Sequence, residues 1–153
     1  MTATDLPAIT GIVLMVEEAR HLAPHAHITL LAPFGRDNRP SREEIAEVER
    51  FFADITPFDF VLNGDSRFPE GARYLSPEPA GIFTRLTHGL HQLFPEYPPY
   101  EGRFDLVVPH LTIPDDVPAP GEPLAAHARE AALLHFHGEF TELATFPFGT
   151  SAA

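Results

Sequence analysis

Two short segments of the sequence each carry a histidine followed two residues later by a threonine. Residues 27–30 read HITL, and residues 110–113 read HLTI. An imidazole has a reference pKa near about 6.5, so it can accept or donate a proton close to neutral pH. A threonine hydroxyl can donate a hydrogen bond to an anionic oxygen. The pattern is therefore typical of a site that transfers protons and stabilises negative charge.

Both segments are predicted to be β-strands with one chemical face and one core face. Side chains alternate across a strand, so His27 and Thr29 share a face while Ile28 and Leu30 point to the other side. The same alternation holds for residues 110–113. A single copy of such a pattern arises readily by chance, whereas two copies in similar surroundings do not. The alternative is that both histidines are partly buried strand residues satisfied by their neighbours.

The elements expected around these strands form a repeat. Each His-x-Thr segment is followed by a proline, a loop, a helix and a further strand. The helices are predicted over about 41–53 and 123–134, and the strands that follow them over 57–62 and 136–146. Two strand–helix–strand units are therefore expected.

The remaining elements fit one domain spanning residues 1–153. Ser41 and Glu44 are spaced as a capping box at the first helix. Gly64 to Ser66 is interpreted as a hairpin turn and not as a serine-hydrolase nucleophile, because no matching oxyanion loop follows. Other expected elements are a strand over 6–16, a turn at 63–64, a short strand at 73–75, a helix over 79–94 and an extended segment over 104–108.

Composition excludes several classes of chemistry. The 153 residues contain no cysteine, which rules out thiolate nucleophiles, disulfides and Cys-ligated zinc. The longest apolar run, residues 8–16, is too short to cross a bilayer, and no cationic segment typical of a secretory signal precedes it. A cytoplasmic protein is the expectation.

The charge balance narrows the range of anionic substrates. The formal net charge is −12, from 22 acidic and 10 basic residues, and all the basic ones are arginines. Proteins that bind long nucleic acids rely on a broad basic field, which this sequence lacks. A local group of arginines can still hold a small phosphate. Mononucleotides or short oligonucleotides are therefore favoured over long RNA.

The two motifs and their flanks carry a family resemblance. HAHITLLAPF at residues 25–34 and YPPYEGRFDLVVPHLTI at residues 97–113 resemble the signature segments of the two-histidine (2H) phosphoesterases, in particular the 2′-5′ RNA ligase and cyclic phosphodiesterase branch. The resemblance extends over about residues 8–145. It implies a bilobed α+β fold, with two antiparallel sheets in a pseudo-twofold arrangement, helices on the outside and one His-x-Thr strand on each side of a cleft. It implies no metal and no cofactor.

The resemblance also implies an activity. His27 and His110 would serve as general acid and base, in an order that the sequence leaves open, and Thr29 and Thr112 would donate to phosphate oxygens. The expected reaction opens a 2′,3′-cyclic phosphate on a nucleotide or a short RNA end, and its reverse joins RNA through a 2′-5′ linkage. The alternative is a binding module with the same fold that holds a nucleotide or phosphorylated ligand without turning it over.

Four further residues are candidates for substrate contact. An arginine can grip a phosphate and an aromatic ring can stack on a nucleobase. The competing interpretations are a solvated loop charge and core packing. The candidates are Arg103, Tyr100, Phe34 and Tyr74.

The other histidines receive structural interpretations. His25 could join His27 as a metal pair on one strand face, but Pro24 favours a loop there. The pairs at 88 and 91 and at 135 and 137 are interpreted as solvated or capping histidines. Relatives usually end in a longer terminal hairpin, so an open sheet edge, which a second subunit could cover, is also expected.

Overall fold

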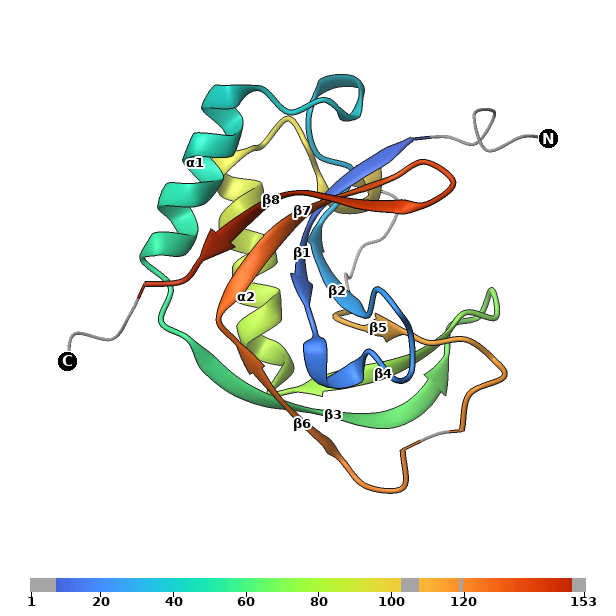
Figure 1. Cartoon of the computed structure of the whole chain (residues 1–153). Coiled ribbons are helices and arrows are strands. Elements are labelled where there is room, and N and C mark those ends of the chain that lie inside the picture. The colour runs from blue at the N-terminus through green and yellow to red at the C-terminus, as the bar shows by residue number, and fades with distance from the viewer. Residues whose placement is uncertain (1–7, 103–107, 119, 150–153) are drawn as a thin grey trace.

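The computed structural model describes residues 8–102, 108–118 and 120–149 (Figure 1). The strands are β1 (Ile9–Met15), β2 (His27–Leu31), β3 (Phe58–Arg67), β4 (Arg73–Glu78), β5 (Leu111–Thr112), β6 (Leu124–Ala128), β7 (Glu130–Phe136) and β8 (Phe140–Pro147). The helices are α1 (Arg42–Ala53) and α2 (Ala80–Leu93), with short 3-10 helices η2 (Glu17–Ala19), η3 (Arg36–Asn38) and η4 (Pro99–Gly102). Among the described residues, neither α-helix is long and apolar enough to cross a membrane.

The strands form one curled antiparallel sheet with the order β6-β3-β4-β5-β2-β1-β7-β8. The predicted α+β class is confirmed. The two expected antiparallel sheets correspond to the two halves of this sheet, β6-β3-β4-β5 and β2-β1-β7-β8. They are joined edge to edge where β2 pairs with β5, with Ile28 opposite Leu111. The two strands that carry the His-x-Thr motifs are therefore adjacent at the centre of the sheet.

Helix α1 forms because its start is capped and one side is apolar. The Ser41 side chain accepts from the Glu44 backbone, and the Glu44 carboxylate accepts from the Ser41 backbone, which confirms the predicted capping box. Val48 and Phe52 are fully buried, and α1 packs on β8. The Phe52 ring stacks on Phe146 with centroids 6.1 Å apart. These contacts cover one end of the sheet.

Helix α2 covers the join between the two halves of the sheet. It packs on β2 and β4 (Figure 1). The residues that it buries are Phe83, Leu86 and Leu90. Ile28 and Leu111 belong to the same apolar core. Because side chains alternate along a strand, the intervening polar residues of β2 and β5 must face away from α2. We call this opposite side of the sheet the open face.

The predicted helix over 123–134 is wrong. These residues form β6 and β7 instead, and β6 pairs with β3 from Phe58 opposite Ala128 to Leu62 opposite Leu124. Alanine and leucine are good helix formers, but tertiary pairing overrides that preference. In β7, Ala131 to Leu134 are buried on both sides of the sheet, a run that lacks strand alternation. The predicted strand–helix–strand repeat is therefore absent from the second half.

Two turn predictions are also corrected. The β3 strand continues through Asn63 and Gly64 to Arg67, with a register shift between Asn63 and Asp65 and a φ of +73° at Gly64. Glycine at positive φ is suited to a β-bulge, so residues 64–66 belong to a bulged strand and not to a hairpin turn. The short partner predicted at 73–75 is the start of the longer β4.

The C-terminal strand predicted over 136–146 corresponds to β8, and residues 137–139 form the turn of the β7–β8 hairpin. The β7 strand ends at Phe136, the His137 backbone donates to Glu139 at 3.1 Å, and β8 begins at Phe140. The β8 strand lies at the edge of the sheet. The extended segment predicted at 104–108 lies almost wholly outside the described residues, of which only Val108 is described.

Candidate active site

The pairing of β2 with β5 places the histidine and threonine of each motif opposite those of the other motif. Ile28 lies opposite Leu111 in an antiparallel register. One residue further along each strand, the same register sets Thr29 opposite His110 and His27 opposite Thr112. All four side chains then lie on the open face, and each histidine has a threonine across from it.

The two histidines are therefore diagonal neighbours. Diagonal positions across an antiparallel pair are about 7–8 Å apart, within reach of long and aromatic side chains. The charge of His110 acts on the pKa of His27, which is consistent with this proximity. Both rings are half-buried. The arrangement brings together two imidazoles that are far apart along the chain.

Each imidazole is held by the same kind of hydrogen bond. His27 Nδ1 lies 2.7 Å from the carbonyl oxygen of His25, and His110 Nδ1 lies 2.8 Å from that of Val108. A carbonyl oxygen can only accept, so Nδ1 carries the hydrogen in both rings. The Nε2 atom is then the nitrogen that gains or loses a proton in each histidine. Both rings are fixed in the tautomer that suits them for acid–base chemistry at Nε2.

The surroundings of His27 favour its neutral form. Burial lowers the pKa of His27 from its ordinary value, the bond to the His25 carbonyl opposes this shift, and the nearby His110 and His25 rings lower the pKa further. Desolvation and like charges both disfavour the imidazolium form. A neutral imidazole is the form that accepts a proton. His27 is thus better suited than an isolated histidine to be unprotonated below neutral pH.

Aromatic rings support the two histidines from opposite halves of the sheet. Phe140, at the start of β8, packs edge-on against His27 with centroids 5.6 Å apart. Phe68, which follows β3, packs edge-on against His110 at 4.8 Å, and Tyr74 lies 5.8 Å from the same ring. These contacts limit rotation of both imidazoles. Phe68 and Phe140 were not predicted as site residues, and no local pattern marks them, because only folding of the two hairpins brings them to the site.

Tyr100 reaches Thr29 from the segment that follows α2. Burial raises the pKa of Tyr100, and an interaction of its phenol with the Thr29 side chain opposes that shift. The Tyr100 backbone N–H also donates to the Ala32 carbonyl at 2.6 Å, beyond the end of β2. Tyr100 therefore lies beside the first motif, through a contact that its spacing in the sequence does not reveal. The substrate contact expected of it stays a prediction.

Of the other three substrate-contact candidates, one is corrected. Phe34 has 0% exposure and packs edge-on against Phe94 and Tyr97, so it is a core residue with no surface for a ligand. Tyr74 lies opposite Thr112 on the open face, where its ring stacks on Phe68. Arg103 lies outside the described residues.

His25 lies beside His27 but without the surroundings of a metal site. The ring of His25 is exposed and packs on Phe140 with centroids 5.2 Å apart. Within the part of the chain that the structure describes, no three His, Cys, Asp or Glu side chains are grouped so that they could hold a metal ion. His25 contributes its carbonyl oxygen and its nearby charge to His27.

Arg73 holds the loop that follows the second motif by hydrogen bonds. Its guanidinium donates from Nε and Nη2 to the Asp65 carboxylate at 2.8 Å, and from Nη1 to the carbonyl oxygens of Pro114 and Val117 at 2.9 and 2.8 Å. The Arg73 carbonyl accepts from the Ile113 backbone at 3.0 Å. Planar, forked guanidinium geometry is suited to such a set of acceptors. These bonds hold the chain directly after Thr112 against β4.

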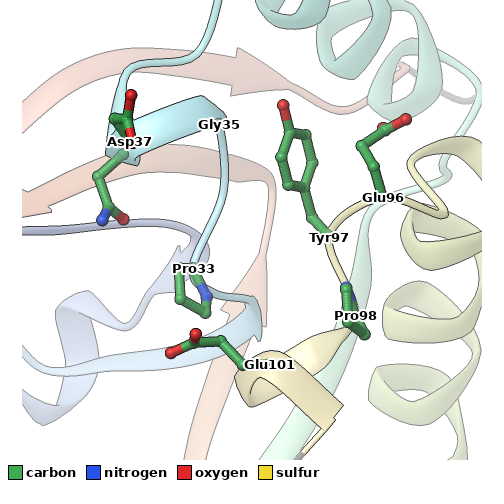
Figure 2. A pocket seen from close by; sticks show the side chains of 8 residues that line it. Pro33, Gly35, Asp37, Glu96, Tyr97, Pro98 and Glu101 are labelled. Carbon is green, nitrogen blue, oxygen red and sulfur yellow. The ribbon is translucent and has the colours of Figure 1, made fainter.

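A separate hollow of about 360 Å³ lies beside the segment that leads to Tyr100 (Figure 2). Carboxylates of Asp37, Glu96 and Glu101 are among the side chains around it. Negative charge at such a wall opposes binding of an anion. The residues that line the hollow are Pro33, Gly35, Asp37, Asn38, Glu96, Tyr97, Pro98 and Glu101. None of them is one of the four histidine and threonine residues of the motifs, so this hollow is not the site for phosphate chemistry.

Known proteins resemble this chain in sequence and in fold. The family model described as the 2′-5′ RNA ligase superfamily matches residues 14–148, a range that contains both motifs. A curated protein of Geobacillus kaustophilus (strain HTA426), named "Putative phosphoesterase GK0864", is 33% identical over 95 residues. That match covers 60% of this chain and 52% of the relative, so the match spans about half the length of that protein.

Solved structures share the fold at low sequence identity. The protein TT0787 of Thermus thermophilus has a TM-score of 0.63 and 21% identity, covering 94% of this chain and 99% of the other. E. coli LigT complexed with NADP+ has a TM-score of 0.61 and 16% identity, covering 95% and 99%. LigT complexed with 3′-AMP has a TM-score of 0.62 and 15% identity, covering 94% and 99%. The likeness extends over nearly the whole chain.

Proposed function

Because the chain belongs to the 2′-5′ RNA ligase superfamily, we propose that it is a phosphodiesterase that opens 2′,3′-cyclic phosphates without a metal ion. One observation carries the proposal most directly. The register of Ile28 opposite Leu111 makes the two histidines diagonal neighbours on one face, each with a threonine across from it. A site that only bound a ligand would not need two proton carriers.

The chemistry requires two proton transfers on opposite sides of phosphorus. Water attacks the phosphorus atom, and the bond from phosphorus to either the 2′ or the 3′ oxygen breaks. One imidazole takes the proton of the attacking water, and the other gives a proton to the departing oxygen. The product is a phosphomonoester with a free hydroxyl group. The same groups, acting in the same direction on a 5′-hydroxyl in place of water, would break the bond from phosphorus to the 3′ oxygen and leave a 2′-5′ linkage.

The environments of the two imidazoles favour one assignment for hydrolysis. Burial and two neighbouring imidazoles lower the pKa of His27, which favours its neutral form. We assign His27 as the base and His110 as the acid in the hydrolytic direction. Both act through Nε2, since each Nδ1 is bonded to a backbone carbonyl. The roles exchange when the reaction runs in reverse.

We assign Thr29 and Thr112 to stabilise the negative charge that develops on the phosphate oxygens. Their hydroxyls would donate to the two non-bridging oxygens, where negative charge is held in the transition state. Removing one such donor from an enzyme commonly costs a factor of about 100 to 1,000 in kcat. The position of each threonine opposite a histidine allows both contacts to be made to one phosphate.

A nucleotide or a short RNA end is the proposed substrate. Structures of LigT complexed with 3′-AMP, ATP and NADP+ support a nucleotide ligand for this fold. The net charge of −12 disfavours extended contacts with a long polyanion. The aromatic side chains of Tyr74 and Tyr100, both half-buried at the site, are available for contact with a base or sugar.

The test is turnover of 2′,3′-cyclic AMP, CMP, GMP and UMP in the presence of EDTA, followed by chromatography of the monoester product. We expect hydrolysis by the wild type and none by the His27→Ala/His110→Ala double variant. Hydrolysis that disappears with EDTA and returns with a divalent ion would contradict the metal-independent mechanism. Tight calorimetric binding with no product from any of the substrates would favour the alternative binding module.

A further inference from the structure

Phe140 lies at the start of β8, far along the chain from the first motif, yet its ring contacts that motif. Its centroid is 5.6 Å from that of His27, at an interplanar angle of 66°, and 5.2 Å from that of His25. The carbonyl oxygen of His25 lies 2.7 Å from His27 Nδ1 and accepts its hydrogen bond. Residue 25 therefore holds the His27 ring through its backbone, and Phe140 contacts both imidazoles.

A separate group of apolar side chains anchors the Phe140 ring. Its buried members come from β1 and β7, and they are Val13, Ala132 and Leu134. Phe140 and Met15 pack against them. In the register of β1 with β2, Met15 lies opposite His27. Val13 lies opposite Thr29 in the same pairing. The apolar group therefore borders both residues of the first motif on the β1 side.

We propose that Phe140 is a positioning residue that orients the His27 imidazole and keeps water from one side of it. This inference rests on the proposed function, in which His27 is the base. Aromatic rings prefer edge-on contacts of this kind, so the Phe140 ring restricts rotation of the imidazole. The ring also fills space that water would otherwise occupy. Burial is the largest cause of the lowered pKa of His27, in line with this role.

Other titratable groups lie near His27, and the test must leave them in place. His110 is the diagonal neighbour of His27, and the rings of His110 and His25 both lower the pKa of His27. The charged and titratable residues that line a neighbouring hollow of about 140 Å³ are Glu17, Arg20, His25 and Glu142. Replacing Phe140 by an apolar residue removes none of these charges. A change in the His27 pKa then reports access of water to the ring.

The test compares Phe140→Ala with Phe140→Leu. Alanine opens one side of His27 to water, whereas leucine keeps apolar bulk there. In Phe140→Ala, we expect the His27 pKa, measured by NMR titration, to rise towards its ordinary value. We also expect kcat for 2′,3′-cyclic AMP to fall about tenfold with little change in KM, because a misoriented base fails mainly in the transition state.

Phe140→Leu separates exclusion of water from orientation of the ring. We expect the His27 pKa to stay low and kcat to fall about threefold, since apolar bulk remains but the edge-on contact is lost. The matched control is Leu143→Ala on the same strand. Leu143 is 52% exposed, so its replacement should leave both quantities at their wild-type values.

The inference requires both changes in Phe140→Ala, and either one without the other would overturn it. A loss of kcat with an unaltered His27 pKa would mean that Phe140 supports only the fold of the hairpin. A His27 pKa that falls further would mean that the ring stabilises the imidazolium form, contrary to the proposed role. Melting temperatures show whether each variant is folded. If Phe140→Ala does not fold, wild-type kcat in Phe140→Leu would overturn the inference.

These outcomes also distinguish the inference from the proposed function. A folded wild type that hydrolyses none of the cyclic nucleotides would overturn the proposed function, and the role of Phe140 in catalysis with it. An active wild type with an unaltered Phe140→Ala variant would overturn only the role of Phe140.

Discussion

His27 and His110 lie diagonally across the β2–β5 pair, and each donates from Nδ1 to a carbonyl oxygen two residues earlier in the chain, at 2.7 and 2.8 Å. The same local bond therefore orients both rings. The rings are packed by different partners, Phe140 for His27 and Phe68 for His110. Two chemically equivalent groups thus occupy different environments, which is what an acid and a base in one site require.

Replacing either histidine should abolish turnover. General acid–base catalysis commonly contributes about 100- to 10,000-fold, so His27→Ala and His110→Ala should each lower kcat by at least about 100-fold. The double variant should be little worse than either single one, because the two groups act as a unit. His88→Ala is the control, since His88 is exposed on α2. Activity that survives either site substitution would refute the assigned roles.

The pKa of His27 can be measured directly by NMR titration of its ring signals. It should lie below 6.5, because burial and like charges both disfavour protonation. In a His110→Asn variant it should rise towards the ordinary value, since one of the neighbouring charges is gone. No change on removing His110 would show that the rings do not interact.

The lowered pKa of His27 should also determine the pH dependence of kcat/KM. With His27 as base, activity requires its neutral form, so the rate falls as pH drops through the pKa of His27. The acid limb should therefore lie below pH 6.5, the ordinary imidazole value. His25→Asn removes another charge that lowers this pKa, so the limb should move to higher pH. A limb that moves to lower pH, or not at all, would contradict the charge interaction.

Arg73→Lys should destabilise the protein and weaken the second motif. Lysine keeps the charge but cannot make the fork to Asp65 together with the bonds to the carbonyls of Pro114 and Val117. We expect a lower melting temperature and a lower kcat. The control is Arg67→Lys, whose partner Asp115 lies at 2.7 Å in an exposed ion pair of little consequence. Equal melting temperatures for the two variants would show that the Arg73 bonds do not hold the loop.

Phe52→Ala should test how α1 is attached to the sheet. Phe52 has 0% exposure and stacks on Phe146 and Phe148. Replacing a buried phenylalanine by alanine costs about 3–5 kcal/mol of stability. Chemical denaturation of the wild type and the variant measures that difference. A loss below about 1 kcal/mol would mean that α1 contributes little to the core.

The features that were predictable from sequence were those fixed by local rules. Alternation in residues 27–30 predicted a strand with His27 and Thr29 on one face, and the capping box at Ser41 and Glu44 predicted the start of α1. The helix predicted over 123–134 was wrong because its alanines and leucines suit a helix as well as a buried strand. The choice between the two was made by pairing with β1, β3 and β8, which local sequence does not encode.

The sequence by itself determined the chemical groups: two imidazoles, two hydroxyls, and the alternation that turns each pair to one side of its strand. Tertiary structure decided how they meet. A single antiparallel contact, Ile28 opposite Leu111, sets each histidine across from the other motif's threonine. The strands are separated by many residues, and their register depends on burial of Ile28 and Leu111 in the shared apolar core. Long-range packing of this kind has no local signature, which is why Phe68, Phe140 and the proximity of Tyr100 to Thr29 became visible only in the folded chain.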